Sequence, residues 1–207
     1  MVIYYRLKDK ILNLFKNKVL GKKYLGTRLS QPVWESQFSS GYWDHLYNQD
    51  EQEHYQEICS LYNSYSSGKS ILDVGCGQGV LYHYLKEYSE IGQEYFGIDI
   101  SSAAIEIAKQ KFVGINFIQL DFDRKQLTGK FDVIIFNETL YYFDKPIEKI
   151  EECRRLNLAV GGCFIISMCE YDGHEEIWKK LEEKYSFIKL RLIQNKNGQK
   201  WQVCILS

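Results

Sequence analysis

The stretch Ser70-Ile-Leu-Asp-Val-Gly-Cys-Gly-Gln-Gly79 decides the fold of this chain. It opens on a short apolar run, as expected of a buried parallel strand, and glycines follow at positions 75, 77 and 79. Residues 80–85 then indicate a helix. A strand that enters a helix through a glycine-rich turn presents free backbone N–H groups to a ligand. The stretch therefore predicts a ligand-binding loop, with a turn of purely structural purpose as the alternative.

The glycine spacing separates two classes of nucleotide-binding loop. The pattern is G-x-G-x-G, because the third glycine comes two residues after the second. In the dinucleotide fingerprint, G-x-G-x-x-G, the third glycine comes three residues after the second. This spacing disfavours an NAD-dependent oxidoreductase.

Strands and helices alternate after the loop, which indicates a mostly parallel sheet covered on both faces. The expected strands span residues 70–74, 94–99, 115–120, 131–137 and 162–168. The expected helices span residues 51–65, 79–88, 102–112, 145–157 and 174–184. Two further strand-like runs, 187–193 and 201–206, flank a turn at Asn195-Lys-Asn-Gly198 and predict an antiparallel hairpin.

Acidic residues lie on or after three of these strands. Asp99 closes the second strand, where a carboxylate can accept hydrogen bonds from ribose hydroxyls. An N-cap for the next helix is the alternative. Asp121 follows the third strand, where an aspartate is also a common turn residue. Asp73 lies inside the first strand, and a buried carboxylate there needs a partner.

The acid-G-x-G-x-G loop, the two downstream acids and the hairpin together resemble the class I S-adenosylmethionine (SAM)-dependent methyltransferases of small molecules, over residues 65–207. The resemblance implies an α/β fold with a Rossmann-like seven-stranded sheet, mostly parallel, with a C-terminal antiparallel hairpin. It implies SAM as cofactor and S-adenosylhomocysteine (SAH) as product. Residues 66–207 would form the SAM-binding domain, and residues 1–65 a helical N-terminal cap. Val160-Gly-Gly162 stands where the family has Pro-Gly-Gly before the fifth strand.

The resemblance also assigns cofactor contacts. Asp99 would hold both ribose hydroxyls, with Ile100 beside the adenine, and Asp121 and Phe122 would meet the adenine amino group and ring. Asp73 would orient the loop and face the cofactor's ammonium. The full implied cofactor set is Asp73, Gly75, Cys76, Gly77, Gly79, Asp99, Ile100, Asp121, Phe122 and Asn137.

Glu138 is the strongest catalytic candidate, because it follows the fourth strand at the edge of the sheet where ligands bind. Methyl transfer mainly requires alignment of the acceptor and control of its proton. Tyr141 and His83 are weaker candidates, and a solvated loop carboxylate is the alternative for Glu138. The Asp/Asn-Pro-Pro-aromatic motif of amino-methyltransferases is absent, which disfavours a nucleic-acid base as acceptor.

Residues 31–47 are rich in aromatic side chains and predict two helices joined by a turn. Mixed aromatic and polar groups suit a cover over a small-molecule pocket. The acceptor-binding candidates are therefore Trp34, Tyr42 and Trp43, together with Tyr142 after the fourth strand. Packing onto the sheet edge is the alternative for each.

Composition narrows the class of protein. Hydrophobic residues make up 45% of the 207 residues, so one ordered domain is expected. The six cysteines form no C-x-x-C pair, which predicts buried free thiols in a cytoplasmic protein. No apolar run is long enough to span a membrane. The histidines lack partners at ligand spacing, so no metal is expected.

Charge is uneven along the chain. Residues 1–28 hold eight Lys/Arg and one acid, a net charge of +7 within a total of −1. Apolar residues recur there at nearly helical spacing. A helix that covers the core or a partner subunit is favoured over an anchor to a membrane surface, RNA or an acidic partner.

These patterns together predict a SAM-dependent methyltransferase that acts on oxygen or nitrogen of a small molecule, such as a sugar or natural-product intermediate. No nucleic-acid partner is expected. The alternative is a methyltransferase-like module that binds SAM or a partner without catalysis. The sequence specifies neither the acceptor nor the oligomeric state.

Overall fold

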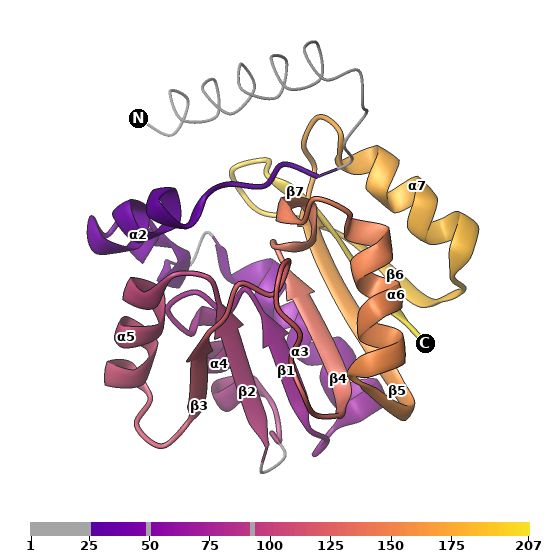
Figure 1. The fold of residues 1–207 in the computed structure, drawn as a ribbon. Helices are drawn as coiled ribbons and strands as arrows, with labels where there is room; N and C mark the ends of the chain where they lie inside the picture. The colour runs from indigo at the N-terminus through magenta and orange to yellow at the C-terminus, as the bar shows by residue number, and fades with distance from the viewer. Residues whose placement is uncertain (1–25, 49–50, 92–93) are drawn as a thin grey trace.

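The computed structural model describes residues 26–48, 51–91 and 94–207, so most of the basic N-terminal segment lies outside the described residues. Helices and strands alternate along this part of the chain (Figure 1). The helical elements are α2 (Gln31–Ser39), η1 (Asp44–Tyr47), α3 (Gln52–Ser66), α4 (Val80–Tyr88), α5 (Ser102–Lys111), η3 (Leu140–Tyr142), α6 (Pro146–Leu156) and α7 (His174–Lys184). The strands are β1 (Ile71–Val74), β2 (Tyr95–Asp99), β3 (Asn116–Gln119), β4 (Phe131–Asn137), β5 (Leu158–Cys169), β6 (Phe187–Gln194) and β7 (Lys200–Leu206).

The strands form one sheet in the order β3-β2-β1-β4-β5-β7-β6. Strands β1 to β5 pair in parallel, whereas β7 runs antiparallel to both β5 and β6. The predicted seven-stranded sheet with a C-terminal hairpin is confirmed. From β1 the chain builds outward to β3, then crosses to β4 on the other side of β1. The strand order therefore reverses between β1 and β4, which is where open α/β sheets bind ligands.

Helices cover both faces of the sheet. Helices α3, α4 and α5 contribute to one apolar cluster, and α6 and α7 contribute to the other. In Figure 1, α6 and α7 lie in front of the sheet and α3 and α4 behind it. Ile71 and Leu72 are neighbours in β1 and belong to opposite clusters, as the alternation of side chains along a strand requires. Burying each such side chain stabilises the fold by about 1.5–3 kcal/mol.

The fifth strand begins earlier than the sequence indicated. It starts at Leu158, and the expected turn at residues 160–162 is a bulge inside the strand. The register jumps from Phe131↔Leu158 to Val133↔Cys163, so the extra residues loop out and leave Val160 exposed. Gly161 takes φ = 76° there, a conformation that glycine adopts without strain. Gly161 and Gly162 are therefore part of a bulge inside β5 and not of a turn before it.

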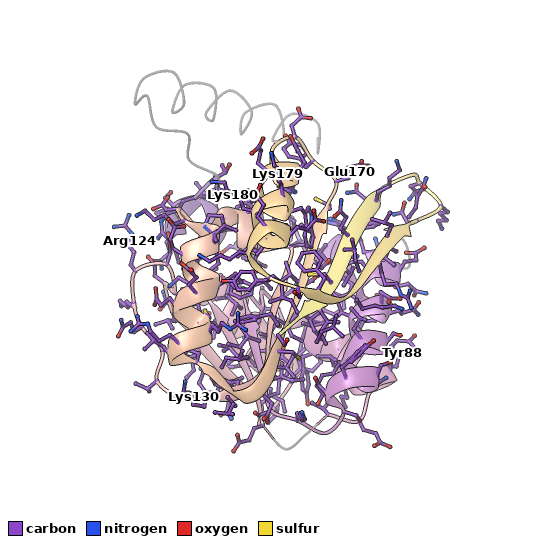
Figure 2. All side chains as sticks on the ribbon, turned by 90° about the vertical axis from the view of Figure 1, so that its right-hand side faces the viewer. Tyr88, Arg124, Lys130, Glu170, Lys179 and Lys180 are labelled. Atoms are coloured by element: carbon purple, nitrogen blue, oxygen red, sulfur yellow. The ribbon has the colours of Figure 1, made fainter. Side chains whose placement is uncertain are left out.

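The carboxyl ends of the parallel strands and the cap lie at the same end of the molecule (Figure 1). In Figure 2, Lys130 just before β4 and Glu170 just after β5 mark the two ends of these strands. Helix α3 packs its buried face into the core. Among the described residues, 26–48 therefore cover the carboxyl ends, and 52–66 belong to the sheet's own packing.

All six cysteines lie within the described residues, where none forms a disulfide bond, and all but Cys169 are buried. Within the described ranges, no helix has the length and hydropathy needed to cross a membrane. The same residues contain no cluster of three or more His, Cys, Asp or Glu side chains arranged for a metal ion.

Candidate functional site

A cavity of about 1080 Å³ opens where the strand order reverses. Its floor is the loop after β1, and its sides are the segments that follow β2, β3, β4 and β5. Residues of the cap and of the first turn of α3 close it from above. The cavity therefore has one end at β1 to β3 and another between β4, β5, β7 and α3.

The glycine loop wraps tightly around the end of β2. The backbone N–H groups of Gly75 and Cys76 both donate to the Ile98 carbonyl, at 2.7 and 3.0 Å. Gly75 has φ = 75°, and a Cβ added there would collide with the Thr139 side chain. The Thr139 hydroxyl in turn donates to the Val74 carbonyl at 2.8 Å. Glycine is required because the loop both takes a left-handed turn and packs against its neighbour.

Gly77 and Gly79 differ in what they do. Gly77 lines the cavity, and its N–H donates to Asp99. Gly79 does not line it: with φ = 83° it precedes the first turn of α4, and a Cβ there would press on Phe112. Gly79 is thus a packing and helix-start residue, although the sequence placed it with the cofactor contacts.

Asp99 is held at the cavity wall by backbone groups. Its two carboxylate oxygens accept from the N–H groups of Gly77 and Ser101, at 2.9 and 2.8 Å. Burial raises its pKa to about 6, against the lowering effect of these N–H donors. The N-cap of α5 is Ser101, whose Oγ accepts from Ala104 N, so the alternative N-cap assignment of Asp99 is not needed. Each oxygen keeps lone-pair capacity toward the cavity.

Asp73 is a second buried carboxyl group at the cavity. The Tyr95 hydroxyl donates to its Oδ2 at 2.5 Å. Burial raises the Asp73 pKa to about 7, and the Tyr95 hydrogen bond partly opposes that rise. A cation placed in the cavity near this carboxyl would therefore favour its ionised form.

Arg28 organises the end of the cavity after β3, a feature that sequence reasoning missed. Its guanidinium donates to Asp121 Oδ2 at 2.6 Å and to Asp123 Oδ2 at 2.7 Å. Asp121 Oδ1 is buried and has no hydrogen-bond partner within residues 26–48, 51–91 and 94–207, and Phe122 and Ile100 also line the cavity. The sequence showed Arg28 only as one charge of the basic segment, because nothing local ties it to acids 93 and 95 residues away.

Glu138 is the one non-glycine residue of the described chain with a positive φ, 55°. Its N–H donates to the Ser167 carbonyl at 2.9 Å, which holds the strained turn at the end of β4. Its carboxylate accepts from the Tyr141 hydroxyl at 3.1 Å. Burial raises its pKa to about 7, and hydrogen bonds from Cys169 and Tyr141 oppose the rise. The side chain thus resembles a general base poised near neutrality.

The aromatic residues of the cap gather over the cavity, as expected. The Trp34 and Tyr142 rings meet edge to face at 4.8 Å, and Tyr42 and Trp43 do so at 4.9 Å. All four line the cavity. They line the pocket and pack against one another, and their contact with the acceptor stays a prediction.

Glu35 joins the cap to α5. Its carboxylate accepts from the backbone N–H groups of Ser102 and Ala103, at 2.8 and 2.9 Å, and from the Ser101 hydroxyl at 2.8 Å. Burial favours a higher Glu35 pKa, but the donors, Ala103 foremost, lower it to about 2. Sequence reasoning did not single out Glu35, because its partners are 66–68 residues away.

His83 is not brought to the cavity. Its side chain is 43% exposed on the outer face of α4, and its Nε2 lies 3.8 Å from Glu87 Oε2. The opposite face of α4 packs on the sheet, so His83 lies on the face of the helix that is turned toward solvent. We therefore withdraw His83 as a catalytic candidate. The far wall instead holds residues that the sequence did not assign to the site, among them His54, Tyr55, Cys169, His174 and Trp201.

A family model described as a methyltransferase domain matches residues 65–204. The chain belongs to this family. The predicted resemblance is thereby confirmed, and with it a SAM-dependent methyltransferase domain with the expected fold.

Curated relatives include two ubiquinone biosynthesis O-methyltransferases. The protein from Nitrosococcus oceani is 34% identical over 102 residues, which cover 46% of this chain and 42% of the relative. The protein from Pseudomonas paraeruginosa is 30% identical over 105 residues, covering 48% and 44%. The chain spans less than half the length of these relatives.

Solved structures share the fold at low identity. The N-methyltransferase NodS from Bradyrhizobium japonicum, in complex with SAH, has a TM-score of 0.70 at 20% identity and covers 85% of this chain and 96% of its own. Magnesium protoporphyrin IX methyltransferase from Synechocystis, with bound SAM, has a TM-score of 0.63 at 20% identity, covering 86% and 97%.

Proposed function

We propose that this chain transfers a methyl group from SAM to an oxygen or nitrogen atom of a small molecule. The observation that carries the proposal is the pairing of the glycine loop with Asp99 at the wall of one cavity. That cavity extends without a break to Glu138, the one strained acidic residue of the described chain. A cofactor end and a reaction end thus share one cavity.

The residues at the β1 to β3 end fit SAM. Asp99 would accept from the ribose hydroxyls, since both of its oxygens are oriented by backbone donors and retain lone pairs. Asp121 Oδ1, buried without a partner, would accept from the adenine amino group between Ile100 and Phe122. Each of these contacts satisfies a polar atom that the protein alone leaves with capacity to spare.

The residues in the middle of the cavity suit a positively charged group on the ligand. Asp73 is a buried carboxyl with a raised pKa, and it would ionise against the ammonium group of SAM. Asn137 Oδ1 is buried without a partner and is a further acceptor there. Cys76 and Gly77 contribute the loop backbone that the cofactor would pack against.

SAM would supply a methyl carbon activated by its positive sulfur, and the methyl–sulfur bond would break to leave SAH as product. Glu138 would receive the proton of the acceptor O–H or N–H as that atom bonds to the methyl carbon. Tyr141 would hold the Glu138 carboxylate in place through its hydroxyl hydrogen bond. The aromatic cap would align the acceptor and exclude water, which supplies much of the rate in such displacements.

The proposal of a small-molecule acceptor rests on the aromatic side chains of the cap that line the cavity. The relatives named as ubiquinone O-methyltransferases and the NodS N-methyltransferase support transfer to oxygen or nitrogen. Residues 26–48 would act as the cap over the acceptor. The contribution of residues 1–25 stays a prediction, with a cover for the core or a partner favoured over a membrane contact.

The test is a screen with methyl-labelled SAM against small hydroxyl and amine acceptors, using wild type, Glu138→Gln and Glu170→Gln. Glu170 is an exposed carboxylate beyond β5 and is the matched control. We expect Glu138→Gln to keep SAM binding and to slow transfer about 10²–10⁴-fold, and Glu170→Gln to act as wild type. Equal rates for both variants would remove Glu138 from the mechanism. SAM binding with no transfer to any acceptor would favour the non-catalytic module.

A further inference from the structure

His54 is a buried polar side chain that the proposed methyl transfer does not use. Its side chain lies in the first turns of α3, and the residue is 1% exposed and lines the cavity. Both ring nitrogens are buried and have no hydrogen-bond partner among the described residues. Leaving such groups unsatisfied is costly, so native proteins rarely do it without a ligand or water that completes the bonds.

Aromatic rings hold the His54 ring in one orientation. Its imidazole stacks on the Trp201 indole at 4.7 Å with 16° between the planes, and the Tyr55 ring lies 4.1 Å from it. Because the two ring nitrogens lie in the plane of the imidazole, the hydrogen bonds of His54 form at the edge of the ring. Burial lowers the His54 pKa to about 3, so the ring is neutral and offers one donor and one acceptor.

The His54 wall is continuous with the reaction end of the cavity. The Tyr55 hydroxyl contacts the side chain of Asn137, the residue directly before Glu138 in the sequence. Trp201 is paired with Cys169 across β5 and β7, and Cys169 hydrogen-bonds to the Glu138 carboxylate. A molecule whose reacting atom meets Glu138 therefore lies in the same space as the His54 edge.

The charge at the reaction end of the cavity disfavours an anionic acceptor. Among the described lining residues the permanent cations are Arg28 and Arg124, and Arg28 is paired with Asp121 and Asp123. Arg124 lies 68% exposed at the β3 end. The reaction end carries the carboxylates of Glu51 and Glu138. A carboxylate or phosphate on the acceptor would meet no free positive charge there.

We propose that His54 is a specificity-determining residue that binds a second polar group on the acceptor, and that the acceptor is an uncharged molecule with at least two hydroxyl groups. One hydroxyl would meet Glu138, and the other would exchange hydrogen bonds with the His54 ring edge. A vicinal diol of a sugar and a diphenol share this chemistry. The proposal rests on the proposed function, because it names the acceptor class of the same site.

The test uses SAH-saturated protein and three probes: catechol, methyl α-D-glucopyranoside and benzoate. Ring ¹⁵N NMR reports hydrogen bonding at His54 directly, and titration of each probe gives its affinity. His54→Phe keeps a ring in the aromatic stack and removes both nitrogens. His83→Phe is the matched control, because His83 lies outside the cavity.

We expect catechol or the glucoside to shift the His54 nitrogen signals, and the stronger of the two to identify the source of the diol. His54→Phe should weaken that probe about tenfold or more, leave SAH affinity unchanged and leave the melting temperature equal or higher, because an unsatisfied polar group is removed. His83→Phe should bind as wild type.

Three results would overturn the proposal: no shift at His54 with either diol, equal diol affinity in His54→Phe, or benzoate binding as tightly as the diols. A lowered melting temperature in His54→Phe would likewise assign the ring to packing. None of these results would argue against SAM binding. Failure of wild-type protein to bind SAH would instead overturn the proposed function, and this inference with it.

Discussion

Replacing Glu35 with alanine removes the carboxylate that joins the cap helix α2 to the first turn of α5. That carboxylate accepts hydrogen bonds from the backbone N–H groups of Ser102 and Ala103 and from the hydroxyls of Ser101 and Ser102. The four distances are 2.8–3.0 Å. It also places negative charge at the positive end of the α5 dipole. The substitution therefore uncaps one helix and releases another.

The expected loss in unfolding free energy follows from the shifted pKa of Glu35. The Glu35 pKa is lowered from 4.5 to about 2 by its donors despite the opposing effect of burial, and each pKa unit corresponds to about 1.4 kcal/mol. Discounted for the partial exposure of the side chain, the loss in unfolding free energy is about 1–2 kcal/mol at pH 7. Loss of a helix cap has the same typical size. Because the folded pKa is depressed, this stabilisation is complete above about pH 4.5 and is lost as the pH falls toward 2.

Urea unfolding at pH 7 and pH 3 measures this difference for wild type, Glu35→Ala and Glu35→Gln, with Ser36→Ala as the control on the exposed face of the same helix. We expect Glu35→Ala to lose about 1–2 kcal/mol at pH 7 and clearly less at pH 3. Glu35→Gln should fall between, because its amide oxygen still accepts. Equal stability of wild type and Glu35→Ala at pH 7, or a loss that does not shrink at pH 3, would refute the reasoning.

Three further predictions concern the site. Gly75→Ala should abolish tight SAM binding and lower the melting temperature, because its Cβ would collide with Thr139 at a positive φ; unchanged calorimetric affinity would contradict this. Methyl transfer should rise as the pH increases through about 7, following ionisation of Glu138, and a profile that stays flat from pH 5.5 to 8.5 would exclude it as base. Arg28→Ala should weaken SAM binding about fivefold or more by freeing Asp121 from its ion pair, and Arg28→Lys should restore part of that affinity in the same titration.

The parts of the fold that depend on local pattern were predictable from the sequence. The loop from Asp73 to Gly79, the alternation of strands and helices, and the C-terminal hairpin all follow from apolar runs and turn residues near each other in the chain. The start of β5 was missed, because a bulge at Gly161 looks like a turn when the partner strand is unknown.

The site was predictable only where the fold places strand ends together. Asp99 and Glu138 were found because carboxyl ends of parallel strands meet at one edge of the sheet. Arg28, Glu35 and His54 were not, since their partners are distant in sequence and only packing brings them near. His83, a weaker catalytic candidate from the sequence, lies outside the cavity because tertiary packing sets which way each face of a helix points.

The most direct test of the central claim is calorimetric titration of SAM and SAH into wild type, Asp99→Ala and the control Glu106→Gln, an exposed carboxylate on α5. The account predicts tight binding by wild type and by the control. Loss of the ribose hydrogen bonds in Asp99→Ala should weaken binding by about 1.5–3 kcal/mol, or roughly tenfold to a hundredfold. Folded wild-type protein that binds neither ligand, or an Asp99→Ala affinity equal to that of wild type, would contradict the account.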